Sequence, residues 1–180
     1  MHTLVIILAT AFACVTASAQ ELKGLTLGQS MASAVEELGG AKRCINGVST
    51  TSCHMLASDA AKTFQTFAGH PADGLALGAV GDKLGSIYIS FGNGPYDDIK
   101  AALVQKYGPT TCEDSATSNV MGVTFKQQNC GWDFDNGATI RMQRICGKIN
   151  IGCLNLSSKA WLEDFTARTK RDQTKAVNDL

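Results

Sequence analysis

The spacing of apolar residues predicts three helices. The first spans 31–38, behind Ser30, a residue type that favours helix N-caps, and stops at Gly39-Gly40. The second spans 93–109, between Gly94-Pro95 and Gly108-Pro109. The third begins after Ser157-Ser158. The apolar positions that define them are Met31, Ala34, Val35 and Leu38 in the first, Tyr96, Ile99, Leu103 and Tyr107 in the second, and Trp161, Leu162 and Phe165 in the third.

Between the helices the period changes to two, which predicts strands. Ile87, Ile89 and Phe91 alternate with polar or small neighbours, and 74–80 reaches this strand through a turn at 81–83. Asn136-Gly137 is a strong signal for a tight hairpin turn. Further apolar alternation marks Met121, Val123 and Phe125, then Trp132 and Phe134, then Ile140 and Met142, and finally Leu154 and Leu156.

This order predicts the α+β class, with an antiparallel sheet that carries its helices on one face. Strands that arrive in consecutive hairpins pair antiparallel, and helices that bracket them cover one side. Because the order is helix, strands, helix, strands, helix, it suggests two related halves. Each half would be a helix followed by a meander.

The N-terminal segment has the pattern of a removable signal peptide, 1–19. An apolar run at 3–13 is too short to span a bilayer and is followed by Ala17-Ser18-Ala19, a small-x-small cleavage pattern. The alternative, lipidation at Cys14, would need a small residue where Phe12 stands. We therefore expect a periplasmic or secreted protein: one domain at 20–170 and a polar tail at 171–180.

Six cysteines remain after removal of this segment, and an even number in an exported domain predicts three disulfides. Six cysteines allow 15 connectivities. Locality favours the pairs Cys44–Cys53 and Cys146–Cys153, and Cys112 and Cys130 then pair by elimination. A zinc site is the competing interpretation, but there is no CxxC pair and neither remaining histidine has ligand spacing.

Two segments resemble small exported bacterial proteins built from a helix and an antiparallel meander. They are GQSMASAVEELGG at 28–40 and YDDIKAALVQKYGPT at 96–110. The similar families are the β-lactamase-inhibitor proteins and the small lipoprotein of the outer-membrane assembly machine. The resemblance implies an architecture; an activity does not transfer with a fold.

Charge and motifs exclude several classes of function. The chain has 16 basic and 16 acidic residues, whereas nucleic acids and anionic membranes are bound through excess positive charge. Beyond 1–19 no apolar run is long enough to cross a membrane. The DFDNG sequence at 133–137 opens like a calcium loop, but Arg144 stands where an EF-hand needs Glu. No cofactor is expected.

The leading hypothesis is a non-enzymatic, protein-binding or inhibitor-like domain of the cell envelope, with another envelope or extracellular protein as its partner. If the apolar strand positions face the helices, the alternate positions form an uncovered second face. The candidate partner-binding residues on that face are Tyr88, Thr124, Lys126, Arg141 and Gln143. The alternative is a small exported hydrolase that uses His54 or His70 as its base, although no GxSxG nucleophile motif occurs.

We predict that the mature protein begins at Gln20 and contains no free thiol. Intact mass measured with and without reduction tests this, because three disulfides take up about six hydrogens. A smaller gain, or a mass that includes residues before Gln20, would contradict the prediction.

Overall fold

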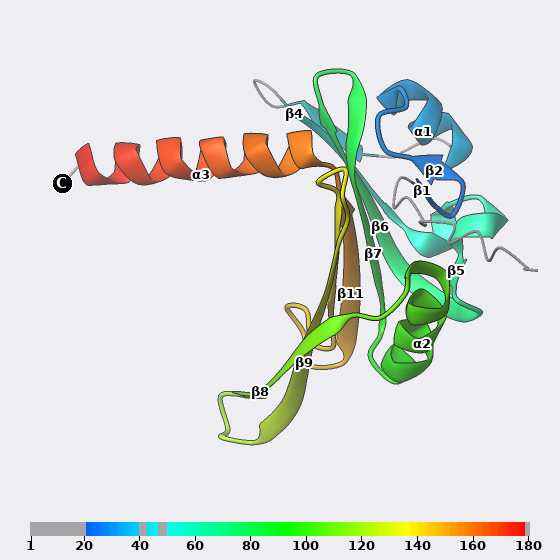
Figure 1. Ribbon diagram of the computed structural model, residues 1–180, viewed down its shortest axis with the longest axis vertical. Coiled ribbons are helices and arrows are strands. Elements are labelled where there is room, and N and C mark those ends of the chain that lie inside the picture. Colours follow the sequence, from blue (N-terminus) through cyan, green and yellow to red (C-terminus); the bar gives the residue numbers. More distant parts are fainter. Residues whose placement is uncertain (1–20, 40–42, 47–49, 179–180) are drawn as a thin grey trace, which may run out of the picture.

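The computed structural model describes residues 21–39, 43–46 and 50–178, and the predicted signal peptide lies outside them. A small hairpin comes first, followed by a large antiparallel sheet with three α-helices (Figure 1). The helices are α1 (Met31–Glu37), α2 (Tyr96–Tyr107) and α3 (Lys159–Asn178). The α+β class is confirmed.

The large sheet has nine strands within the described residues. Eight follow the order β3-β4-β6-β7-β11-β10-β9-β8, and β5 pairs with β6 beside this path. Their bounds are β3 (Arg43–Asn46), β4 (Thr50–Leu56), β5 (Thr66–Phe67), β6 (His70–Val80), β7 (Lys83–Gly92), β8 (Thr111–Ser118), β9 (Thr124–Asp133), β10 (Thr139–Gln143) and β11 (Ile151–Ser157). The small hairpin pairs β1 (Glu21–Leu22) with β2 (Leu25–Thr26), and two short 3₁₀ helices occupy Ala57–Asp59 and Lys62–Phe64.

The sheet order divides into two meanders, as the element order suggested. α1 is followed by β3, β4, β6 and β7, and α2 by β8, β9, β10 and β11. The last strand of each meander pairs with the last strand of the other, from Gly92 opposite Ile151 to Ser86 opposite Ser157. The first strands, β3 and β8, therefore lie at the two edges.

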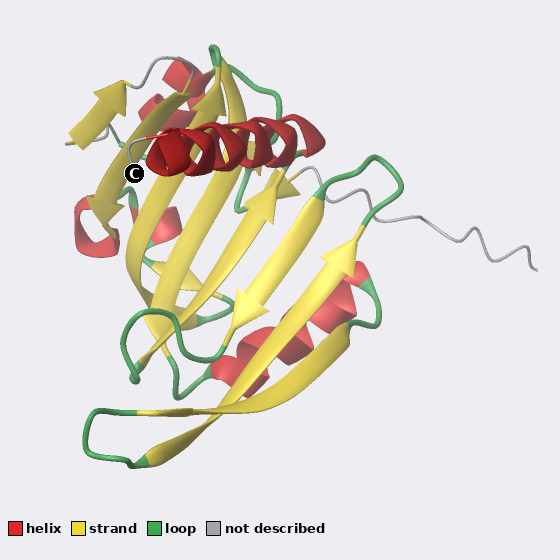
Figure 2. Ribbon diagram, turned by 90° about the vertical axis from the view of Figure 1, so that its left-hand side faces the viewer, coloured by secondary structure: helices red, strands yellow, loops and turns green. Residues whose placement is uncertain are grey.

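Helices α1 and α2 pack on one face of the sheet, called here the helix face (Figures 1 and 2). Ser30 caps α1 as predicted, because its Oγ accepts a hydrogen bond from the Ser33 amide at 3.0 Å. The core lies between the helices and the sheet, and its largest side chains are fully buried. These include Leu38, Ile87, Phe91, Tyr96, Ile99, Ile140, Met142 and Leu154, each less than 2% exposed.

The third helix corrects the prediction that all helices share one face. α3 starts where expected, with Ser158 Oγ accepting from the Trp161 amide, but it rises from the opposite face of the sheet (Figures 1 and 2). The reason is the space left by two glycines. A Cβ on Gly78 would lie 2.4 Å from the Trp161 ring, and one on Gly85 would lie 3.1 Å from its Cβ. Trp161 is thus half-buried on the open side and does not belong to the helical layer.

α3 also continues beyond the predicted domain end at 170. The structure is helical through Asn178, so the polar segment 171–178 extends the helix. From Phe165 onward most of its described side chains are exposed. Within the described residues, no helix is both long enough and apolar enough to span a membrane.

All three predicted disulfides are present. Cys44–Cys53 joins directly opposed residues of β3 and β4, and Cys112–Cys130 does the same for β8 and β9. In each half, therefore, the edge strand is linked covalently to its neighbour, with Cα atoms 4.1 Å apart. Cys146–Cys153 closes the connection between β10 and β11. These disulfides indicate an oxidising compartment.

Leu103 tests the packing of α2. It is 4% exposed in the core, so Leu103→Ala should lower the free energy of unfolding by about 2–5 kcal/mol, through lost burial and a cavity. The measurement is denaturant unfolding with the disulfides intact. Val104→Ala is the matched control, since Val104 is 37% exposed on the same helix and should cost less than about 0.5 kcal/mol. Equal costs would show that α2 does not pack by this face.

Candidate functional site

The sheet face opposite α1 and α2 is the candidate site, and we call it the open face. Strand register fixes its members: Tyr88 lies opposite Ala76 on one side and Asn155 on the other, and Asn155 lies opposite Arg141. Small or neutral polar side chains dominate it. The residues of this face, from β4 to β9, are Ser52, His54, Leu56, Gly74, Ala76, Gly78, Ser86, Tyr88, Ser90, Cys153, Asn155, Ser157, Thr139, Arg141, Gln143, Asp133, Gly131, Asn129, Gln127 and Phe125.

A groove of about 940 Å³ lies on the open face beside the root of α3. The sheet supplies a floor of small residues, and the helix supplies a wall of Trp161, Leu162 and Phe165. Two apolar residues of the groove remain exposed, Leu56 at 63% and Phe165 at 54%. Arg168 lies 5.4 Å from the Trp161 ring and 5.8 Å from that of Phe165, close enough for cation–π attraction.

Tyr88 stands between this groove and the third disulfide. Its ring lines the groove, and its hydroxyl lies 3.5 Å from Cys146 Sγ. Partial burial raises the pKa of the Tyr88 hydroxyl above its ordinary value. Next to it, Ser86 Oγ donates to Asn155 Oδ1 at 2.8 Å. The aromatic ring is therefore held among neutral hydrogen-bonding groups.

Arg141 lies further along the same face, as predicted, and several hydrogen bonds hold its guanidinium in place. It donates to Asp133 Oδ1 at 2.5 Å and to the Trp132 and Ile140 carbonyl oxygens. It also lies over Gly131, where a Cβ would come within 2.9 Å of it. Its side chain is nevertheless 50% exposed. Gln143, two residues on, shares this face and is exposed.

The prediction that Lys126 and Thr124 belong to this face is wrong. β9 runs without a register shift, and its even-numbered residues Cys130 and Trp132 are buried on the helix face. Lys126 therefore points to the helix side, where its Nζ lies 3.6 Å from Asp114 Oδ2. Gln127 and Asn129 take the open-face positions on this strand, and the Gln127 amide donates to Asn129 Oδ1 at 3.2 Å.

The two histidines are not brought together. His54 lies in β4, paired with Ala76 of β6, and lines the groove. His70 begins β6, where its Nε2 lies 3.5 Å from Asp98 Oδ2 at the start of α2. In the described part of the chain, neither imidazole is hydrogen-bonded to a serine or threonine hydroxyl. The hydrolase hypothesis therefore gains no supporting contact.

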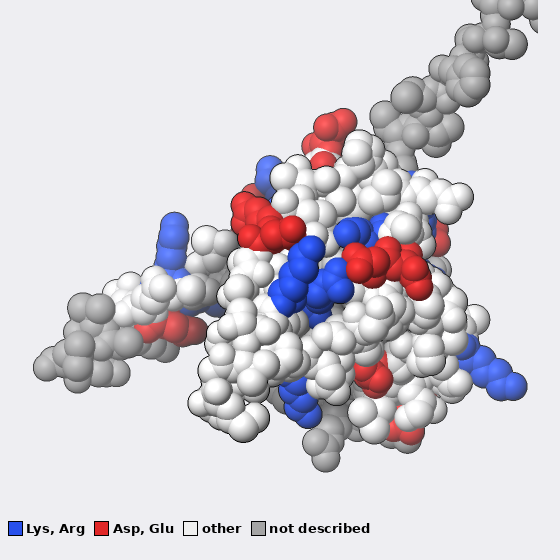
Figure 3. Space-filling view, turned by 90° about the horizontal axis from the view of Figure 1, so that it is seen from below, with Lys and Arg blue, Asp and Glu red and all other residues white. Residues whose placement is uncertain are grey.

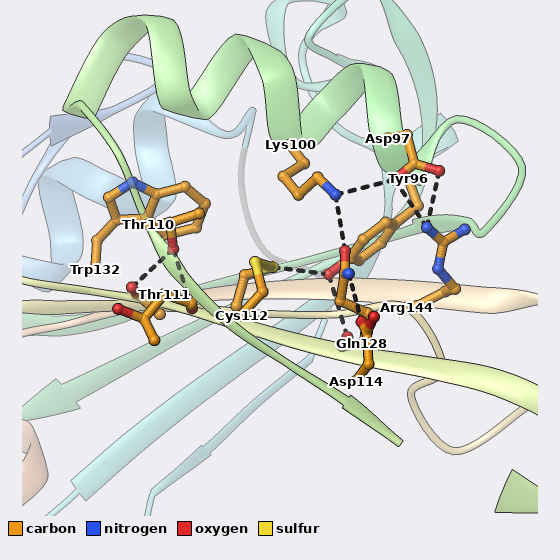
Figure 4. Close-up of a disulfide and its surroundings, with 12 residues drawn as sticks. Tyr96, Asp97, Lys100, Thr110, Thr111, Cys112, Asp114, Gln128, Trp132 and Arg144 are labelled. Carbon is orange, nitrogen blue, oxygen red and sulfur yellow. Dashed lines mark hydrogen bonds and ion pairs between the residues drawn. A yellow bond between two sulfur atoms is a disulfide. The ribbon is translucent and has the colours of Figure 1, made fainter. Parts of the chain in front are cut away.

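A second polar cluster lies on the helix face, at the start of α2 (Figure 4). Tyr96 is fully buried, and its hydroxyl donates to the Gln128 carbonyl oxygen at 3.1 Å and to Cys130 Sγ at 3.4 Å. Arg144 lies 4.3 Å from the Tyr96 ring and donates to both oxygens of Asp97 at 2.8 Å. Lys100 completes the cluster, donating to Asp97 at 3.1 Å and to Gln128 at 2.8 Å.

The charged groups of this cluster pair with one another, which gives it a structural role, although Arg144 Nε is buried without a hydrogen-bond partner among the described residues. The hydrogen bond from Arg144 is the main reason why the pKa of Asp97 lies below its ordinary value. A hydrogen bond from the Gln128 amide does the same for Asp114. Burial raises the pKa of Tyr96 to about 12. The cluster joins α2 to β9 and to the loop after β10, beside the Cys112–Cys130 disulfide.

Residues that the sequence analysis did not assign to a site define the two ends of the open face. α3 projects at one end and the β8–β9 hairpin at the other, both toward the same side, so the molecule has a C-shaped profile (Figure 1). Phe165 belongs to the apolar positions that predicted the third helix, and Met121 and Val123 to strand positions expected to face the helices, yet all three are exposed. Their exposure follows from the length of both elements, which extend past the body of the sheet.

Comparison with protein-family models, with curated proteins and with solved structures finds no match to this chain. Its function must therefore be judged from the contacts of its own residues.

We predict that the Asp97–Arg144 pair makes stability depend on acid pH. Because folding lowers the pKa of Asp97, its contribution is fully present above the unfolded-state pKa of about 3.9 and is lost as the pH falls through the folded-state pKa. Asp97→Asn should reduce the fall in unfolding free energy over this range, measured by urea unfolding at a series of pH values. Arg144→Gln should act likewise, and the double variant should add little to either. Additive effects would show that the two residues do not act as a pair.

Proposed function

We propose that this protein is an exported protein-binding domain of the cell envelope that holds its partner against the open face. The observation that carries the proposal is a continuous sheet surface, from β4 to β9, left uncovered between two projecting elements. A convex protein surface fits such a concave one. An inhibitor-like role, in which the partner is an enzyme, uses the same face.

The chemistry of the open face supports a protein partner. Tyrosine, tryptophan and arginine are the residue types most enriched at interface hot spots, and the face presents Tyr88, Trp161 and Arg141. Between them lie glycine, alanine and serine, which let a partner approach the backbone closely. The exposed apolar groups Leu56 and Phe165 would gain from being covered.

The rigidity of the face lowers the cost of binding. Antiparallel pairing on both sides fixes Tyr88 and Asn155, and Arg141 is hydrogen-bonded to its own strand and to the next. Three disulfides restrain the strands and the connection between β10 and β11. Side chains that are already ordered lose little entropy when a partner docks.

Tyr88→Ala combined with Arg141→Ala tests the proposal. Both residues lie on the sheet surface outside the apolar core, so the fold should survive, and the affinity for a partner captured from envelope extract should fall by at least about 2 kcal/mol. The partner is first retained on the immobilised mature domain, then purified and titrated by calorimetry.

Gln105→Ala is the matched control, because Gln105 is exposed on α2, on the other side of the sheet. It should leave the affinity unchanged. Equal affinities for wild type and the double variant would place the partner elsewhere on the molecule. Failure to retain any partner would count against the proposed function as a whole.

A further inference from the structure

The tip of the β8–β9 hairpin is the most exposed apolar feature among the described residues. Val120 is 105% exposed, Met121 80% and Val123 50%. The three side chains stand within four consecutive residues, at the end of a hairpin that extends beyond the sheet (Figure 1). We call residues 120–123 the hairpin tip. Apolar side chains gathered at a protruding end are typical of contact sites rather than of solvated turns.

Hydrogen bonds hold this tip in one conformation. Asn119 Oδ1 accepts from the amides of Met121, at 3.0 Å, and Val123, at 2.9 Å. The Asn119 carbonyl oxygen accepts from the Gly122 amide, and Gly122 has a φ of +78°, which a side chain would disfavour. Because the turn is ordered before any contact forms, its apolar side chains can enter a pocket at little entropic cost.

The charges around the tip favour a protein pocket over a lipid surface. Residues 111–126 contain two acidic residues, Glu113 and Asp114, and one basic residue, Lys126, so their net charge is −1. Viewed from this end, the molecule shows basic and acidic side chains side by side and no continuous patch of one sign (Figure 3). Anionic membranes attract clusters of basic residues, which this hairpin lacks.

We infer that the hairpin tip is an anchor that inserts into an apolar pocket of the protein held on the open face. The inference rests on the proposed function and adds the chemistry that the partner must offer. The hairpin projects toward the same side as α3, so a protein resting on Tyr88 and Trp161 would meet the tip at its far end (Figure 1). The partner therefore carries an uncharged pocket at that end of its contact surface.

Photo-crosslinking from three positions tests the anchor in the full mature protein. Met121→p-benzoylphenylalanine reports on the tip, Tyr88→p-benzoylphenylalanine on the open face, and Gln105→p-benzoylphenylalanine on the back of α2. Each variant is irradiated in envelope extract, and the crosslinked species are identified by mass spectrometry. The same protein should be linked from Met121 and Tyr88 but not from Gln105.

Affinity measurements on that purified protein complete the test. Val120→Ser with Met121→Ser should weaken binding at least about tenfold, whereas Ala116→Ser, on the exposed stem of the hairpin, should not. Both variants should keep the wild-type unfolding midpoint. Their binding to vesicles of phosphatidylethanolamine and phosphatidylglycerol is measured in parallel by sedimentation.

The outcomes separate the anchor from the proposed function. Crosslinking from Tyr88 alone, or unchanged affinity in the serine variant, overturns the anchor and leaves the open face as the site. Crosslinking from Met121 alone overturns the open face as the binding site and, with it, the inference that the tip anchors a protein held there. No crosslinking from either position overturns both. Vesicle binding that is lost in the serine variant overturns the anchor in favour of a membrane contact.

Discussion

The pairing of β7 with β11 is the constraint on which the rest of the structure depends. It joins the last strands of two meanders through seven opposed residue pairs, from Gly92 and Ile151 to Ser86 and Ser157. Since the pairing is antiparallel, the two halves meet head to tail and their helices lie on the same side. One face then carries the whole core, and the other is continuous across both halves. A break at this seam would leave two small sheets, each with half a core.

Local signals in the sequence were sufficient for most elements. Ser30 and Ser158 cap the helices that they were predicted to begin, and Asn136-Gly137 lies in the connection between β9 and β10. Locality also selected two of the three observed disulfides and elimination left the third, and each joins neighbouring strands or closes the connection between them. Phe165 was misplaced because its burial depends on the side of the sheet that α3 follows. That choice is set by Gly78 and Gly85, some 80 residues earlier in the chain.

The candidate site was only partly predictable, because the face that a strand residue occupies depends on whether it lies an odd or an even number of positions from its neighbours on the strand. Phe125 and Trp132 were both expected to face the core, but they are seven residues apart, and on one unbroken strand they must point to opposite faces. Trp132 has the stronger requirement, because it is buried and its Nε1 donates to the Gly108 carbonyl oxygen. Lys126 therefore lies on the helix face and not on the open face as predicted. Tyr88, Arg141 and Gln143 lie on the open face as predicted, because the alternation of their strands was assigned correctly.

The two cross-strand disulfides have a consequence for how the sheet can open. Sheets ordinarily fray from their outer strands, which have hydrogen-bonding partners on one side only. Here both outermost strands, β3 and β8, are tied to their neighbours through Cys44–Cys53 and Cys112–Cys130. Peeling from either margin is arrested at the bridge, so the inner strands stay protected from proteases that need an extended, detached segment. The two edges of the sheet are therefore protected by disulfides, and this protection lasts only while the surroundings remain oxidising.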